Sequence, residues 1–155
     1  MKKNKFTLIK LFLWLVICQL PGVLGAQFVF SNMDWYRGLL KPPFMPPESV
    51  FGIVWGVLYV MLGLSAFLAF REKFHARPLA LFTAQLALNV CWTPIFFGAH
   101  SLTGALLLLM AMLGEMTGLL RAFWKMDRRA AWLLVPYSAW LVFATYLTVG
   151  VWWLN

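Results

Sequence analysis

The residues of this sequence with the most capacity for chemistry are amides and aromatic rings inside long apolar segments. Gln85, Asn89 and Trp92 follow one another at intervals of four and three, and Trp55 and Tyr59 are four residues apart in another segment. Residues with these spacings lie on one face of a helix. Because an amide exposed to hydrocarbon is costly, Gln85 and Asn89 should face the interior of a helix bundle. The pattern predicts an aromatic-lined cavity; interhelical hydrogen bonding is the preferred role for Gln85, and for Asn89 it is the alternative to a place in the cavity wall.

The last apolar segment carries a comparable face. Trp140, Ala144 and Thr148 are spaced by four residues, so they should line the same cavity from a different helix. Glu115 is the single acidic residue inside an apolar segment. A lone intramembrane acid without a basic partner favours a protonated or hydrogen-bonded structural role, and a proton-coupled role is the alternative.

The sequence lacks the motifs of the common catalytic and metal-dependent reactions. There is no phosphate-binding G-x-x-x-x-G-K-[ST], no H-E-x-x-H and no G-x-S-x-G motif, so hydrolysis, phosphoryl transfer and zinc chemistry are not expected. His75 and His100 fall in connections on opposite sides of the predicted bundle, and Cys18 and Cys91 lie within apolar segments. We therefore expect no catalytic residue, no metal site and no disulfide framework. A cavity of this kind favours a large, flat, mostly apolar ligand.

The elements that position these residues follow from composition. Of the 155 residues, 63% are hydrophobic and 12% are charged, which excludes an ordinary water-soluble domain. The apolar segments are long enough to cross a hydrocarbon core about 30 Å thick. The sequence predicts an all-α polytopic membrane protein, a single domain over 1–155 that forms a bundle of five transmembrane helices, at about 8–30, 49–70, 78–98, 102–124 and 130–154.

The first segment has a second interpretation. Basic residues, an apolar stretch and the small residues at 25–26 resemble a cleavable signal peptide. The apolar stretch continues to Phe30, which is long for a signal and suitable for a span. We interpret it as the first transmembrane helix.

Charge predicts the orientation. The chain has 13 Lys and Arg against 5 Asp and Glu, a net charge of +8. These charges lie between the apolar segments, so they indicate membrane orientation, and no nucleic-acid partner is expected. All the Lys and Arg except Arg37 and Lys41 fall on the side of the amino terminus. The amino terminus should be cytoplasmic, with the lipid bilayer as the main partner.

The connection at 31–48 is then an external loop over the outer mouth of the bundle. It contains Pro42-Pro43 and Pro46-Pro47, and proline lacks a backbone N–H and restricts the residue before it. We expect a stiff, largely extended lid.

Small residues four apart suggest close helix contacts. Such pairs occur as Gly52-x3-Gly56, Ala80-x3-Ala84 and Gly114-x3-Gly118. We expect these pairs to pack helices within one monomer, and contact between two copies is the alternative.

Several segments, taken in order, closely resemble the TspO family of tryptophan-rich sensory proteins and translocator proteins, also called peripheral benzodiazepine receptors. The resemblance rests on Trp35-Tyr36 with LKPPFMPP at 40–47, VWGVLY at 54–59, QLALNVCWTPIFFG at 85–98 and PYSAWLVFAT at 136–145. It extends from the first loop to the carboxyl terminus.

The resemblance implies a five-helix bundle, often a homodimer, that binds porphyrins such as protoporphyrin IX and needs no obligatory cofactor. It implies a sensor, regulator or transport modulator in a bacterial cell membrane. The alternatives are a light- and oxygen-dependent porphyrin-degrading enzyme and a small proton-coupled transporter. Val149 and Trp153 replace the Tyr and Arg of a cholesterol motif proposed for vertebrate members, which favours a tetrapyrrole ligand. The implied binding pocket consists of Trp55, Tyr59, Asn89, Trp92, Trp140, Phe143 and Ala144, and the implied lid of Trp35, Tyr36, Pro42 and Pro43.

Overall fold

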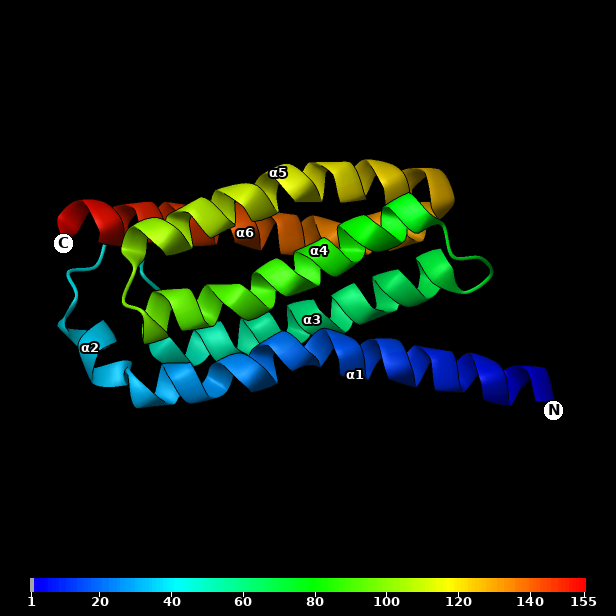
Figure 1. Ribbon diagram of the computed structural model, residues 1–155, viewed down its shortest axis with the longest axis horizontal. Coiled ribbons are helices and arrows are strands. Elements are labelled where there is room, and N and C mark those ends of the chain that lie inside the picture. The colour runs from blue at the N-terminus through cyan, green and yellow to red at the C-terminus, as the bar shows by residue number, and fades with distance from the viewer. Residues whose placement is uncertain (1) are drawn as a thin grey trace.

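The computed structural model describes residues 2–155, with side chains from Thr7 onward. Figure 1 shows long helices lying side by side, with the chain termini at opposite ends of the bundle. Every regular element within the described residues is helical. The elements are α1 (Lys2–Ser31), α2 (Met33–Gly38), α3 (Glu48–Phe70), α4 (Ala76–Thr93), the π-helical segment η1 (Pro94–Gly98), α5 (Leu102–Met126) and α6 (Arg128–Leu154).

The predicted all-α bundle of five spanning helices is confirmed. Five helices in the described part of the chain are long and apolar enough to cross a membrane, the third as α4 continued by η1. Their ends differ from the predicted ones by two residues or fewer. The agreement follows from length, since 23 to 27 residues at about 1.5 Å each exceed the thickness of the hydrocarbon core.

Large apolar side chains cover the outside of the bundle as well as its interior. Val23 and Ile53 are 69% and 68% exposed, whereas Leu62, Met112 and Leu134 are almost completely buried. An apolar exterior is costly in water and favourable in lipid. The surface therefore fits a bilayer.

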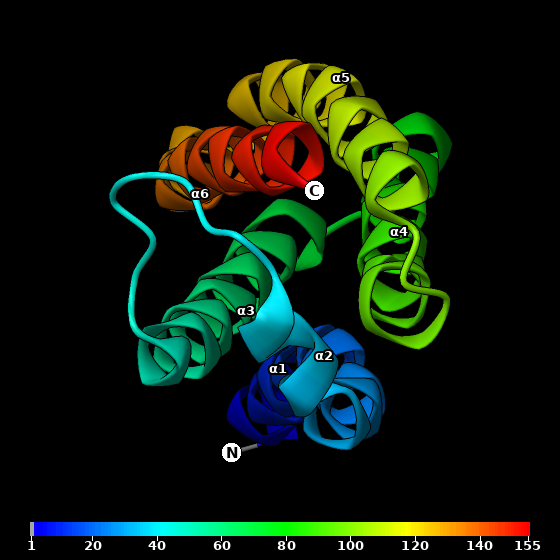
Figure 2. The same ribbon diagram turned by 90° about the vertical axis from the view of Figure 1, so that its left-hand side faces the viewer.

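The helices are arranged as a ring around a space at one end. α1 packs on α3 and α4, α6 packs on α3 and α5, and α4 packs on α5. Figure 2, which looks onto the end that carries the loop, shows α3 and α4 on opposite sides, with α1 below and α6 above. This arrangement leaves α3 and α4 as facing walls.

The loop at 31–48 differs from its prediction as a largely extended lid. Its first part forms the short helix α2, and residues 39–47 are not helical. The prediction was wrong for the first part because the first proline is at position 42, and a proline disfavours helix only at its own position and just before it. Beyond it, Phe44 has a φ of 64°, which reverses the chain within the Pro-rich segment.

A single residue joins α5 to α6. Asp127 Oδ1 accepts a hydrogen bond from the Arg129 backbone N–H at 2.8 Å, and the Arg129 Nη2 donates to Oδ2 at 3.0 Å. This caps the first turn of α6. Hydrogen bonding from the Arg129 side chain lowers the pKa of the Asp127 carboxyl. The charged cap is therefore present at neutral pH and keeps this connection short.

Candidate ligand-binding site

A cavity of about 790 Å³ lies under the loop, between α1, α3, α4 and α6. A cavity is therefore present under the loop, where the sequence predicts one. Its size is within the range of small-molecule sites. Of the residues predicted for the pocket and the lid, those that line it are Tyr36, Trp55, Tyr59, Asn89, Trp92 and Ala144.

Two stacked aromatic pairs form facing walls of this cavity. On α3, the ring centroids of Trp55 and Tyr59 are 5.5 Å apart at an interplanar angle of 29°. On the side of α4 and η1, the rings of Trp92 and Phe96 are 4.9 Å apart at 15°. All four residues line the cavity. Such walls suit a flat apolar molecule, because aromatic rings stack in offset arrangements with planar partners.

The π-helical turn of η1 positions part of this wall. The Ala99 N–H donates to the Pro94 carbonyl at 2.8 Å, an i to i+5 bond that widens the turn. Phe96 and Phe97 are both buried here and both line the cavity. A proline at the start of the turn suits this geometry, because it has no N–H to donate to the preceding helix.

A polar cluster joins α4 to α6 beside the cavity. The Tyr137 hydroxyl accepts hydrogen bonds from Asn89 Nδ2 at 2.6 Å and Gln85 Nε2 at 2.9 Å. Asn89 Nδ2 also donates to the Gln85 backbone carbonyl at 2.8 Å. Both N–H groups of the Asn89 amide are therefore engaged. The Tyr59 hydroxyl donates to the Asn89 Oδ1 at 3.5 Å, and the second lone pair of this oxygen is the acceptor left for a ligand.

Trp140 and Phe143 are not among the lining residues, although the spacing of Trp140 with Ala144 predicts a place in the wall. The indole of Trp140 lies at the contact of α3 with α6, where it packs edge-on against Phe51 and Trp55 at centroid distances of 6.0 and 6.4 Å. Phe143 packs against Trp140 at 5.5 Å. These two rings support Trp55 from behind. The lining face of α6 is instead Ala144, Leu147, Thr148 and Val151.

The predicted lid residues divide between two roles. Tyr36 lines the cavity and is 7% exposed. Trp35 stacks on His100 with a centroid distance of 4.1 Å and packs on Phe96, outside the lining set. Burial and the carboxylate of Glu48 raise the pKa of the Tyr36 phenol. That ring is therefore neutral at physiological pH.

Pro42 and Pro43 attach the loop to α6 instead of facing the cavity. A Cβ at Gly150 would lie 2.5 Å from Pro42 Cβ, so Pro42 rests directly on the helix backbone. The Pro43 carbonyl accepts a hydrogen bond from the Tyr146 hydroxyl at 3.0 Å. The loop therefore depends on the last turns of α6.

An ion pair that was not predicted from the sequence closes the base of the loop. Arg37 donates to the Glu48 carboxylate over 2.9 to 3.3 Å through two nitrogens, and both residues line the cavity. Hydrogen bonding and the charge of Glu48 raise the pKa of the Arg37 guanidinium. The signal was available, since opposite charges lie on either side of the four prolines.

The glycines of α1 and α3 were also missed as site residues. A Cβ at Gly22 would lie 3.2 Å from the Tyr59 ring, and one at Gly25 would lie 2.8 Å from Thr93 Oγ1. Glycine at these two positions therefore lets α1 pack closely against α3 and α4. A Cβ at Gly52 or Gly56 would meet no atom within 4 Å. The prediction that Gly52-x3-Gly56 packs helices together was wrong, because these glycines line the cavity.

Glu115 is separate from this site. Both of its carboxylate oxygens are covered, and neither has a hydrogen-bond partner among the described residues. It is not one of the residues that line the cavity. Of the predicted structural role, protonated or hydrogen-bonded, the hydrogen bond is thus not observed, and protonation stays a prediction.

The fold and the cavity define an α-helical membrane protein that encloses an aromatic-walled, ligand-sized space. The sequence profile of the TspO/MBR family matches residues 14–154. The chain belongs to this family, as the sequence motifs predicted.

Named relatives agree with this membership. The chain is 42% identical to the human translocator protein over 134 residues, covering 83% of this chain and 79% of the relative. It is 36% identical to protein CrtK of Rhodobacter capsulatus over 146 residues, covering 92% and 90%. It is also 36% identical to the tryptophan-rich sensory protein of Cereibacter sphaeroides over 142 residues, covering 92% and 89%.

The polar cluster generates a first prediction. Tyr137→Phe removes the acceptor shared by Gln85 and Asn89 and leaves buried amide N–H groups without a partner. We expect a loss of about 1–2 kcal/mol in folding free energy, the upper range for such bonds in membranes, measured as a lower thermal midpoint in detergent. Tyr59→Phe, which removes only a 3.5 Å contact, is the control. Equal midpoints for the two variants would contradict the assigned role of Tyr137.

The contact between the loop and α6 generates a second prediction. Gly150→Ala places a methyl group against Pro42, so the loop must move away from α6. We expect faster trypsin cleavage after Arg37, because displacement of the loop strains the Arg37–Glu48 ion pair. Gly114→Ala, where an added Cβ meets nothing within 4 Å, is the matched control. Cleavage at the wild-type rate in Gly150→Ala would show that the loop does not depend on this contact.

Proposed function

We propose that this protein binds a porphyrin in the cavity under the loop and acts as a sensor, regulator or transport modulator without transforming the ligand. The observation that carries the proposal is the pair of stacked aromatic walls, Trp55 with Tyr59 and Trp92 with Phe96, on facing sides of a cavity of about 790 Å³. A planar macrocycle matches the aromatic and apolar character of these facing walls.

Stacking and apolar burial supply most of the affinity. Each aromatic pair contributes about 0.5–1.5 kcal/mol beyond the area that it buries. Asn89 Oδ1 accepts a hydrogen bond from a pyrrole N–H, since its amide N–H groups are already engaged. Protoporphyrin IX also carries carboxylates at one edge. The guanidinium of Arg37, at the rim of the cavity, is the group that binds them.

This arrangement gives the ligand a means to act on the loop. A ligand carboxylate competes with Glu48 for Arg37, and the Arg37–Glu48 pair is what closes the base of the loop. Binding therefore changes how firmly the loop is held. Such a change in the exposed loop suits a sensor or regulator.

Proton-coupled transport is not part of this proposal. Glu115, the acid on which that alternative rests, does not line the cavity. In ion-coupled transporters the coupling-ion site and the substrate site typically lie close together.

We propose that the protein lies in a bacterial cell membrane with a cytoplasmic amino terminus. The support is the distribution of basic residues, of which only Arg37 and Lys41 fall on the loop side. The loop and the mouth of the cavity then face away from the cytoplasm.

We also propose a homodimer. The outer face of α4 carries exposed small residues at intervals of four, three and four, namely Ala80, Ala84, Ala87 and Cys91. Small residues permit close approach of helices in membranes. The face is exposed in the monomer, so the prediction that Ala80-x3-Ala84 packs within one copy was wrong.

Cysteine cross-linking tests the dimer. Cys91 is exposed and Cys18 is buried, so mild oxidation of the protein in membranes should give a disulfide-linked dimer through Cys91. Cys91→Ser should abolish the product and Cys18→Ser should not. A wild-type protein that stays monomeric after oxidation, at the same density in the membrane, would reject an interface through this face.

Filling the cavity tests porphyrin binding. Gly56→Val adds a side chain whose Cβ meets no protein atom within 4 Å at a residue that lines the cavity, so the bundle should keep its stability while porphyrin is excluded. We expect affinity to fall about tenfold or more, the size of a steric overlap of about 1–3 kcal/mol. Tryptophan fluorescence quenching and Soret absorbance in the dark measure it.

Two matched controls accompany this experiment. Gly114→Val makes the same change at a position where an added Cβ also meets nothing within 4 Å, outside the lining set. Ala144→Phe, inside the cavity, is compared with Ala139→Phe on the exposed side of the same helix. Equal affinities within each pair would refute the site.

The enzyme alternative has its own readout. If porphyrin absorbance is lost in light but not in the dark, and is lost more slowly in Trp55→Phe, the result supports a light-dependent porphyrin-degrading enzyme instead.

A further inference from the structure

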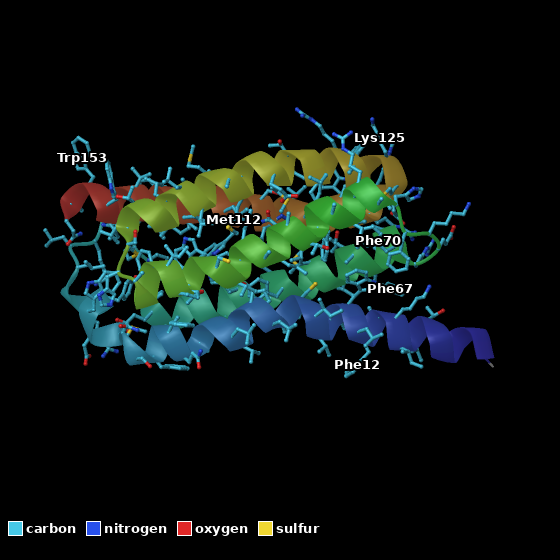
Figure 3. All side chains as sticks on the ribbon, viewed as in Figure 1. Phe12, Phe67, Phe70, Met112, Lys125 and Trp153 are labelled. Carbon is cyan, nitrogen blue, oxygen red and sulfur yellow. The ribbon has the colours of Figure 1, made fainter. Side chains whose placement is uncertain are left out.

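A second hollow of about 930 Å³ lies at the opposite end of the bundle from the loop. It is formed where α3 ends, where the 71–75 connection leads into α4, and where α5 meets α6. Figure 3 shows Phe70 and Lys125 at this end and Trp153 at the other. The porphyrin site uses none of the residues that line this second hollow.

Cationic side chains dominate the rim of this hollow. Its two lining carboxylates are already paired, Glu72 with Arg71 at 3.6 Å and Asp127 with Arg129 at 3.0 Å. The other basic residues of the lining have no carboxylate within 4.0 Å in the described part of the chain. These are Lys73, Arg77, Arg121 and Lys125.

The floor of the hollow is apolar. It is made by Leu68, Ala69, Pro78, Gly118 and Ala122, from α3, α4 and α5. Arg121 lies five residues before the end of α5 at Met126, about 7–8 Å along the helix axis. The cations therefore stand at the depth where a hydrocarbon core gives way to headgroups, above an apolar surface.

Membrane orientation alone accounts for basic residues at this end but not for their arrangement. Orientation requires only that Lys and Arg lie near the helix ends, and side chains spread into water would satisfy it. Here four unpaired cations from three segments surround one hollow that has an apolar floor. Grouping like charges without a counter-ion is unfavourable, so the arrangement indicates an anionic ligand.

We propose that this pocket binds the headgroup of an anionic phospholipid, with the phosphate among Arg77, Arg121 and Lys125 and an acyl chain along the apolar floor. Basic pockets between transmembrane helices bind such headgroups. A free phosphate would satisfy the cations but leave the floor in water. A phospholipid satisfies both parts of the pocket.

The test compares two arginines of equal charge near the α5–α6 connection. Arg121 lines the pocket, whereas Arg128 lies outside it, over the Trp124 ring at 5.6 Å. Dioleoyl phosphatidylglycerol is titrated into the detergent-purified full chain, and bound lipid is counted by native mass spectrometry. We expect Arg121→Gln to weaken binding about fivefold, the worth of one basic residue at a lipid surface. Arg128→Gln should bind like wild type, and phosphatidylcholine should bind weakly to all three.

A second variant and two control measurements accompany this test. Lys125→Gln is a second pocket variant, and the thermal midpoint without lipid shows whether each variant is folded. Porphyrin affinity, measured in parallel, should not change, so failure here is distinct from failure of the porphyrin site. Equal loss in Arg121→Gln and Arg128→Gln would overturn the proposal in favour of general surface charge. Competition by inorganic pyrophosphate as strong as that by the lipid would overturn it in favour of a free phosphate ligand.

Discussion

The structure depends on how a few amides are satisfied in an environment without water. Inside a bilayer a polar group without a partner in the protein is costly. The amide nitrogens of Gln85 and Asn89 on α4 are satisfied together, because both donate to the hydroxyl of Tyr137 on α6, whereas Gln85 Oε1 has no partner among the described residues. The Gln85 side chain and Tyr137 are completely buried. One hydroxyl thus fixes the distance and rotation of α4 relative to α6. The residues of α4 that line the cavity are positioned by the same contact.

The cavity persists because its other sides are held from outside. α1 approaches α3 at a glycine, because a Cβ added at Gly63 of α3 would lie only 3.1 Å from the Leu15 backbone. The loop is bound at both ends, by Arg37 to Glu48 and by paired hydrogen bonds of 3.0 Å between Leu40 and the Asn155 side chain. Helices held in this way need not collapse onto one another. The aromatic rings can therefore face an open space without partners from the opposite wall.

The sequence was sufficient for the helices and for much of the cavity. Length and hydropathy determine spans, and polar faces at helical spacing determine which residues turn inward, as for Asn89 and Trp92. It was insufficient for Trp140, because spacing places a backbone position on a face while the long indole turns to the α3–α6 contact. The Arg37–Glu48 pair was missed because it joins residues eleven apart across a loop whose path no periodicity describes. Gly52 and Gly56 were misread because a small residue permits either helix contact or open space, and only the neighbouring helices decide between them.

The charged side chains are paired at the cavity rim and largely unpaired around the second hollow. At the loop end, Arg37 and Glu48 form an exposed ion pair at the rim of an apolar cavity, so their charges neutralise each other there. At the other end, four cations of the second hollow have no carboxylate partner among the described residues. Lipid headgroups meet the protein at that depth, and an anionic headgroup is the counter-charge available to these cations. A ligand that binds Arg37 at the first site must displace Glu48 from an exposed ion pair, whereas one that enters the second only completes a charge balance. The first site is thereby suited to a conditional response of the loop, and the second to continuous occupation by a component of the membrane.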